Sequence, residues 1–327
     1  MLTFKPIPLW KQLLRTNFVR WNKLAEFLEL SEDQCSLIDV KPHFSLNLPL
    51  RLASKIPKGT IDDPIFKQFI PTMHEKESFA LFFNDPTCDI THQKTPKLLQ
   101  KYDGRALLIC TSACAMHCRY CFRQNYPYET SQGHAFELEL EEISRDTALR
   151  EIILSGGDPL SLSDDVLQSL LRRLSVIPHI RRIRFHTRFP MGIPERIDEA
   201  FLKILGGIQK QLWFVIHANH SNEFDQDIWL KLKEIQKLGI PVLCQSVLLQ
   251  GINDDVDALK RLCEDLVDHG VLPYYLHQLD RVQGAAHFEV TQEKGLWLVE
   301  QLRKQLSGYA VPLYVQEISG ELSKTPL

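Results

Sequence analysis

Short apolar runs alternate with amphipathic stretches along most of the chain, starting near Arg105. Runs rich in β-branched or apolar residues begin near seven positions: Ala106, Glu151, Arg181, Leu212, Pro241, Leu272 and Pro312. The middle intervals are about 30 residues each, the length of one βα unit. Between these runs, apolar residues recur at helical spacing over 164–176, 195–205, 225–238, 255–268 and 293–306. This alternation predicts a parallel sheet covered by helices, and therefore an α/β fold.

The number of repeats favours a barrel. Six or so strand–helix units fit an incomplete (βα)6-type, TIM-like barrel. A doubly wound open sheet is the rival architecture, because periodicity alone does not separate the two.

The first ~95 residues do not follow this alternation. Apolar residues at helical spacing predict a helix over 10–30, and Ser31 is placed to cap a short helix after it. Several prolines break the segment 42–71. We therefore expect a helical arm over 1–95, a partial barrel over 96–311, and a C-terminal strand and tail over 312–327.

Composition and charge remove several classes of protein. With 44% hydrophobic and 24% charged residues, the chain is not collagen-like, coiled-coil or wholly disordered. A net charge of −3 argues against a nucleic-acid partner. No apolar run reaches the roughly 20 residues of a membrane helix, and the N-terminus lacks a signal-peptide pattern. We expect a cytoplasmic protein without a membrane partner.

Three cysteines form the strongest candidate for chemistry. Cys114, Cys118 and Cys121 follow the first strand of the alternating region in a C-x3-C-x2-C pattern. Their soft thiolates favour zinc or an iron–sulfur cluster. Structural zinc sites need four ligands and usually combine two C-x2-C pairs, whereas this chain has no second pair. Three thiolates on a four-iron cube leave one iron open to a small molecule. Zinc completed by His117 or His134, or plain buried cysteines, remain the alternatives.

The pattern Cys114-Ala-Met-His-Cys-Arg-Tyr-Cys-Phe-Arg123 after a first barrel strand resembles the radical S-adenosylmethionine (radical SAM) superfamily. The resemblance implies a [4Fe-4S] cluster held by the three cysteines, whose open iron chelates S-adenosylmethionine. Leu154-Ser-Gly-Gly-Asp-Pro159, after the second strand, resembles the glycine motif that contacts the methionine moiety. By this resemblance Gly156, Gly157 and Asp158 bind S-adenosylmethionine.

Further motifs resemble the lysine 2,3-aminomutase family of that superfamily. They are Ser155-Gly-Gly-Asp158, His217-Ala-Asn-His-Ser-Asn-Glu223, Gln245-Ser-Val-Leu-Leu-Gln-Gly-Ile-Asn-Asp254 and Tyr274-Tyr-Leu-His-Gln-Leu-Asp280. The likeness runs from about Tyr102 to the C-terminus. Its compact length and its ending, Ser319–Leu327, look like the branch devoted to elongation factor P. Enzymes of that branch make (R)-β-lysine from L-lysine, and a partner ligase attaches the product to this translation factor.

The family resemblance also assigns cofactor-binding residues. Moving an amino group between adjacent carbons requires breaking an unactivated C–H bond, which calls for a radical initiator. The resemblance implies that pyridoxal 5′-phosphate holds the migrating nitrogen. Lys324 stands where the family has its pyridoxal phosphate lysine, although most glycines of the family's tail are missing. The tail must therefore fold back over the barrel mouth. Tyr102 and Arg105 resemble residues beside pyridoxal phosphate, and His217 and Gln245 resemble residues that touch S-adenosylmethionine.

Each charged group of the substrate implies a counter-charge. Arg123 matches the family's carboxylate-binding arginine, and a guanidinium suits a carboxylate. Asp280 matches an aspartate that binds the distal ammonium. Glu317 stands where the family has a second aspartate, so its arm is one CH₂ longer.

These expectations lead to one leading hypothesis and two alternatives. The leading one is a radical L-lysine 2,3-aminomutase that uses a flavodoxin- or ferredoxin-type reductant and supplies elongation factor P modification. The second is a catabolic aminomutase acting on lysine or another amino acid. The third, from a different class, is a zinc-stabilised binding protein.

Overall fold

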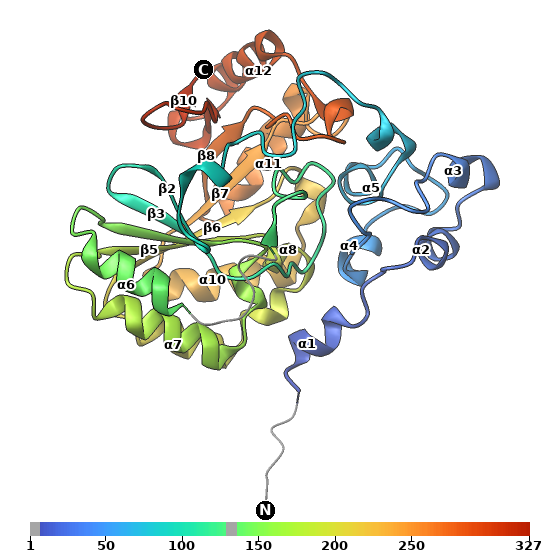
Figure 1. The fold of residues 1–327 in the computed structure, drawn as a ribbon. Coiled ribbons are helices and arrows are strands. Elements are labelled where there is room, and N and C mark those ends of the chain that lie inside the picture. Colours follow the sequence, from blue (N-terminus) through green and yellow to red (C-terminus); the bar gives the residue numbers. More distant parts are fainter. Residues whose placement is uncertain (1–6, 129–135) are drawn as a thin grey trace, which may run out of the picture.

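The central sheet follows chain order from end to end. The structure is a computed structural model that describes residues 7–128 and 136–327. Its ten strands are hydrogen-bonded in the order β1 to β10 (Figure 1). The strands from β3 to β9 run parallel: β3 (Arg105–Ile109), β4 (Glu151–Ser155), β5 (Arg182–Thr187), β6 (Gln211–His217), β7 (Val242–Val247), β8 (Leu272–His277) and β9 (Leu313–Gln316). A doubly wound sheet reverses its strand order at a switch point. This order does not reverse, so the partial barrel is confirmed.

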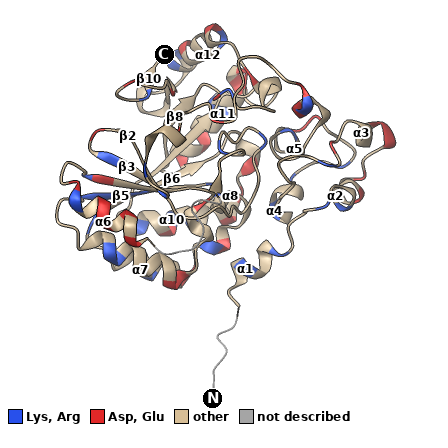
Figure 2. Ribbon diagram, viewed as in Figure 1, with Lys and Arg blue, Asp and Glu red and all other residues tan. Residues whose placement is uncertain are grey.

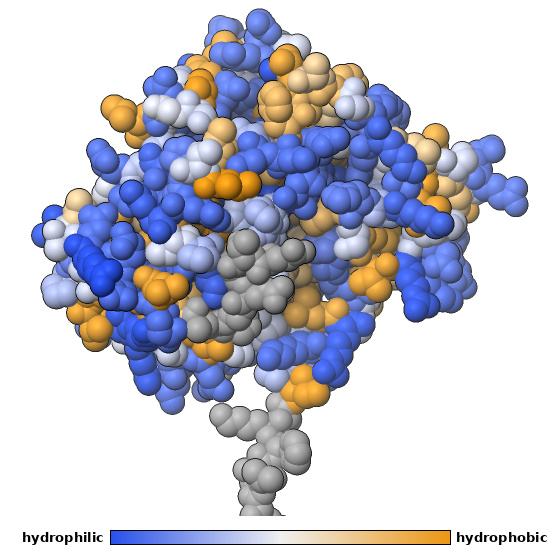
Figure 3. All heavy atoms as spheres, viewed as in Figure 1, coloured by the Kyte–Doolittle hydropathy of each residue, from blue (hydrophilic) through white to orange (hydrophobic). Residues whose placement is uncertain are grey.

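Helices cover the outside of the barrel, as the hydrophobic pattern predicts. They are α6 (Glu137–Arg145), α7 (Asp164–Ser175), α9 (Glu199–Gly206), α10 (Gln226–Lys237), α11 (Val256–Asp268) and α12 (Gln292–Gln305), with the short α8 (Phe189–Gly192) after β5. Most begin at a side-chain cap, for example Ser163 on Val166 N–H and Asp255 on Ala258 N–H. Their solvent faces carry both signs of charge, and the face in Figure 3 is largely hydrophilic (Figures 2 and 3).

The N-terminal arm is helical but more broken than predicted. It contains α1 (Leu9–Leu14), α2 (Trp21–Leu28), α3 (Glu32–Ser36), α4 (Leu50–Ala53) and α5 (Pro64–Phe69). The single helix predicted over 10–30 is wrong. Phe18 exchanges backbone hydrogen bonds with Leu48, which holds the chain extended between α1 and α2. The Ser31 cap is confirmed, as part of a capping box with Gln34. The arm's buried side chains share one core cluster with the barrel.

Both ends of the sheet are antiparallel. At one end, β1 (Gln93–Thr95) and β2 (Leu98–Tyr102) form a hairpin against β3, which the sequence analysis did not predict. At the other, β10 (Thr325–Pro326) pairs antiparallel with β9, so the tail does fold back. The domain boundaries stay a prediction. Among the described residues, none of the helices is long and apolar enough to cross a membrane.

Candidate active site

One cavity of about 750 Å³ collects every residue that the family resemblance assigns to the site. Its lining includes Tyr102, Arg105, Cys114, Cys118, Cys121, Arg123, Gly156, Gly157, Asp158, His217, Gln245, Asp280, Glu317 and Lys324. Most of these side chains lie at or just beyond the carboxyl ends of the parallel strands, where barrel sites are built. Their roles stay predictions, but the fold brings them to one place.

The cysteine loop, defined here as residues 110–128 after β3, is held by the N-terminal arm. Asn47 Nδ2 donates to Cys114 O at 3.2 Å, and Asn17 Nδ2 donates to Ala115 O at 2.8 Å. The backbone N–H groups of His117 and Arg119 donate to Asn47 O and Gln68 O, both at 2.9 Å. Because the loop has little regular structure of its own, these bonds fix the path of its backbone.

The three thiols fit a cluster that leaves one iron open. Burial and the neighbouring thiols raise the pKa of Cys121 to about 11 and that of Cys114 well above its usual value. Three thiols on one loop at a cavity wall are a donor set for a [4Fe-4S] cluster. Among residues 7–128 and 136–327, no group of three His, Cys, Asp or Glu side chains is arranged to hold a single metal ion.

His117 and His134 are the alternative zinc ligands that the sequence offered. His117 Nδ1 lies 2.8 Å from Ser45 O, and its ring stacks on Phe44 at 4.5 Å. The His117 ring is thus engaged with the arm. His134 lies outside the described residues.

The glycine motif packs against the cysteine loop. A Cβ on Gly156, whose φ is +118°, would lie 2.6 Å from Thr111 O, and a Cβ on Gly157 would overlap the Ala113 carbonyl. Glycine is therefore required for backbone packing, a reason that the sequence analysis did not give. Asp158 is buried, and its carboxylate accepts hydrogen bonds from the backbone N–H groups of Leu160, Arg188 and Phe189 and from the Thr187 hydroxyl. It ties the loop after β4 to the loop after β5.

Neutral side chains line the cavity over β6 and β7. His217 and Gln245 are register partners in these strands. Burial, with a contribution from the Arg188 guanidinium, lowers the pKa of His217 to about 3, so the imidazole is uncharged at neutral pH. Its Nε2 lies 3.4 Å from the Tyr120 hydroxyl. These groups offer hydrogen bonds without charge.

A chain of charged groups lines one part of the cavity. Arg123 Nε donates to Asp89 Oδ2 at 2.6 Å, and Lys101 Nζ lies 2.6 Å from Asp89 Oδ1. Lys101 also approaches Glu317, whose other oxygen accepts from Lys324 Nζ at 2.7 Å. Burial tends to raise the pKa of Glu317, but the two lysines hold it below its usual range. The predicted carboxylate and ammonium sites are thus connected electrostatically.

Asp280 has the opposite character. Burial raises its pKa to about 6, although Lys324 acts against that shift.

Tyr102 donates to Glu317 Oε1 at 2.7 Å, and the Arg105 guanidinium carbon lies 4.4 Å from the centroid of the Tyr102 ring. Arg182 and Arg184 also line the cavity, and both pair with Glu151, at 3.2 and 2.8 Å. Two guanidiniums against one carboxylate leave positive charge there for an anionic group such as a phosphate.

Comparisons with known proteins place the chain in a family. The radical SAM superfamily profile matches residues 108–263. The chain is 42% identical over 289 residues to the L-lysine 2,3-aminomutase of Escherichia coli (strain K12), covering 88% of this chain and 84% of that protein. To the Haemophilus influenzae L-lysine 2,3-aminomutase it is 38% identical, covering 97% and 94%. To that of Clostridium subterminale it is 31% identical, covering 97% and 77%.

The chain belongs to the L-lysine 2,3-aminomutase family. Membership makes it an isomerase of the aminomutase class. The family implies a [4Fe-4S] cluster, S-adenosylmethionine and pyridoxal 5′-phosphate, and the thiols, the arginines and Lys324 of the cavity are suited to them.

The sequence analysis missed Asp89 and Lys101, the charged residues that connect the predicted ones in this cavity. Asp89 is buried between Arg123 and Lys101, and Lys101 connects it to Glu317. Asp89 stands in a proline-containing loop without a motif, so no local pattern marks it. Lys101 directly precedes the predicted Tyr102, which was the nearest available signal.

Proposed function

We propose that this protein isomerises L-lysine to (R)-β-lysine by radical chemistry. The observation that carries the proposal is one cavity lined by the three cysteines, by Lys324, and by counter-charges for both ends of a lysine molecule. The comparisons support the same reaction class, because the relatives are named L-lysine 2,3-aminomutase.

The residues of this chain bind and orient the substrate. Arg123, fixed by Asp89, binds the α-carboxylate of lysine, and a planar guanidinium matches its geometry. Asp280 and Glu317 bind the distal ammonium. Lys324, which would hold pyridoxal phosphate, donates to Glu317 in the present structure. With Lys324 engaged by that cofactor, Glu317 would be left to pair with the ammonium of the substrate.

The cofactor sites divide between the two sides of the cavity. Cys114, Cys118 and Cys121 hold the cluster, with Gly156, Gly157, Asp158, His217 and Gln245 around S-adenosylmethionine. Lys324 holds pyridoxal phosphate, with Tyr102 and Arg105 beside it. When bound, these groups supply the hydrogen-abstracting radical and a carrier for the migrating nitrogen.

The product serves the β-lysylation of elongation factor P, through a partner ligase. The greater identity to the Escherichia coli and Haemophilus influenzae proteins than to the Clostridium subterminale protein supports this branch. A flavodoxin- or ferredoxin-type protein acts as the reductant. A catabolic aminomutase is the second candidate, left open by the longer arm of Glu317 and the glycine-poor tail.

Anaerobic turnover tests the reaction. The enzyme is incubated with 13C-labelled L-lysine, S-adenosylmethionine, pyridoxal phosphate and dithionite, and the products are followed by NMR. We expect β-lysine from the wild type and none from Lys324→Ala. Formation of 5′-deoxyadenosine without β-lysine would mean that the substrate is wrong. In cells lacking the gene, loss of the β-lysyl mass from elongation factor P supports the biological role, and an unchanged mass contradicts it.

A further inference from the structure

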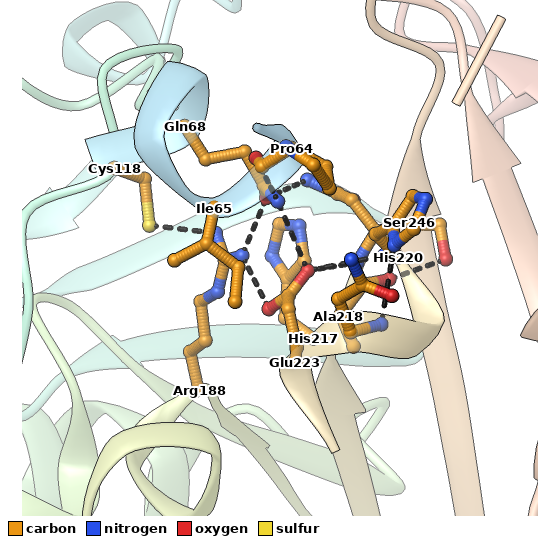
Figure 4. A network of polar contacts seen from close by, with 12 residues as sticks. Pro64, Ile65, Gln68, Cys118, Arg188, His217, Ala218, His220, Glu223 and Ser246 are labelled. Atoms are coloured by element: carbon orange, nitrogen blue, oxygen red, sulfur yellow. Dashed lines mark hydrogen bonds and ion pairs between the residues drawn. The ribbon is translucent and has the colours of Figure 1, made fainter. Parts of the chain in front are cut away.

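Arg188 lies against the sulfur of a predicted cluster ligand. The residue follows β5, and the sequence analysis assigned it no role. Its Nη1 donates to Cys118 Sγ at 2.9 Å (Figure 4). The same nitrogen also donates to the Tyr120 hydroxyl. The guanidinium therefore faces the side of the cavity where the three cysteines lie.

The rest of the side chain is held from several directions. Nη2 donates to Gln68 Oε1 of the N-terminal arm and to Glu223 Oε2, both at 2.7 Å. The guanidinium carbon lies 4.6 Å from the centroid of the Phe69 ring, and only 7% of the residue is exposed. An arginine held in this way delivers its hydrogen bond to the sulfur with little freedom to move away.

We propose that Arg188 sets the reduction potential of the iron–sulfur cluster through its hydrogen bond to Cys118. The inference rests on the proposed cluster. One-electron reduction adds a negative charge to the cluster, and a fixed cation beside a ligand sulfur stabilises the reduced form. Little water screens this interaction in a buried site, and Glu223, paired with the other end of the guanidinium, offsets part of the charge. The N-terminal arm takes part through Gln68, which aims the guanidinium.

Two other roles predict different measurements. If Arg188 is only half of a buried ion pair with Glu223, its removal changes stability but not the potential of a loaded cluster. If it binds the carboxylate of S-adenosylmethionine, its removal weakens that binding at an unchanged potential. Each of these two roles predicts an unchanged reduction potential, whereas the proposal predicts a lowered one.

The test is a potentiometric titration of the reconstituted protein, followed by the electron paramagnetic resonance signal of the reduced cluster. Arg188→Met removes the charge and the hydrogen bond, and Arg188→Lys keeps the charge alone. At the wild-type midpoint we expect about a tenfold lower ratio of reduced to oxidised cluster in Arg188→Met, which corresponds to about 59 mV. The reduction potential of Arg188→Lys should lie between those of the wild type and Arg188→Met. The lysine variant decides the question if Arg188→Met does not load a cluster.

Arg196→Lys is the matched control. Arg196 is also fully buried, pairs with Asp164 at 2.9 Å and packs over Trp10, but it is not among the residues that line the cavity. Its variant should keep the wild-type potential. Equal potentials in all four proteins would overturn the proposal, as would weaker binding of S-adenosylmethionine at an unchanged potential. The titration contains no lysine, so a wrong substrate in the proposed function leaves it unaffected.

Discussion

Asp280→Asn should make the protein more stable and less active. The carboxyl group lies in the cavity just after β8, and burial raises its pKa from 3.8 to about 6. Binding the ammonium of lysine requires the ionised carboxylate. In the protein without lysine, that buried charge therefore lowers the free energy of unfolding. Asparagine has nearly the same shape and carries no charge.

The size and pH range of the effect follow from the shift. Because the pKa is higher in the folded state, folding favours the protonated acid, and stability falls as pH rises from about 4 through about 6. A difference of about two pKa units corresponds to about 3 kcal/mol above pH 7. We expect Asp280→Asn to gain about that amount at pH 8, and roughly half of it at pH 5. Loss of the charged hydrogen bond to lysine should lower kcat/KM by about 10- to 100-fold.

Urea unfolding of the cofactor-free protein at pH 5 and pH 8 measures the stability, and anaerobic turnover measures the activity. Asp103→Asn is a matched control, because Asp103 is exposed in the turn between β2 and β3. Gly104 follows it, and the turn accepts Asn–Gly as well as Asp–Gly. A variant at position 280 that is less stable than the wild type at pH 8, or a difference that does not grow with pH, would refute the reasoning.

Three further substitutions probe other parts of the site. Asp89→Asn should raise KM for lysine at least about tenfold, because Arg123 loses its buried partner, while iron content stays normal in metal analysis. Gly157→Ala should cost about 1–3 kcal/mol in urea unfolding and reduce iron per chain, since its Cβ overlaps the cysteine-loop backbone; Gly308→Ala, with open space around it, is the control. Lys324→Ala should lose both turnover and the absorbance of bound pyridoxal phosphate but keep its iron; persistence of that absorbance would contradict its assignment.

Elements marked by a local period were predictable from the sequence. The strands from β3 to β9 begin within one or two residues of the predicted positions, because each is a short apolar run between amphipathic helices. The hairpin of β1 and β2 was missed because Leu98 and Leu99 are both buried, so the strand lacks the alternation that marks a half-exposed sheet. The broken helix of the arm depends on Leu48, which no local pattern near Phe18 reveals.

The charge network shows why part of the site could not be predicted. Asp89 meets Arg123 across 34 residues, and Lys101 meets Glu317 across 216. Family motifs supplied Arg123 and Glu317, but the groups that join them belong to the loop and hairpin before β3. Only the folded hairpin at the edge of the sheet brings these charges together.

The N-terminal arm is best understood as part of the active site. The cysteine loop has almost no regular secondary structure, so its backbone groups need partners from elsewhere. Asn17, Asn47 and Gln68 supply them, and Gln68 also holds Arg188 against Cys118. Without the arm, the cysteine loop would lose the contacts that fix the cysteines and the neighbouring guanidinium. The position of the thiols and the charge beside them therefore depend on a segment that contains none of the residues predicted to do chemistry.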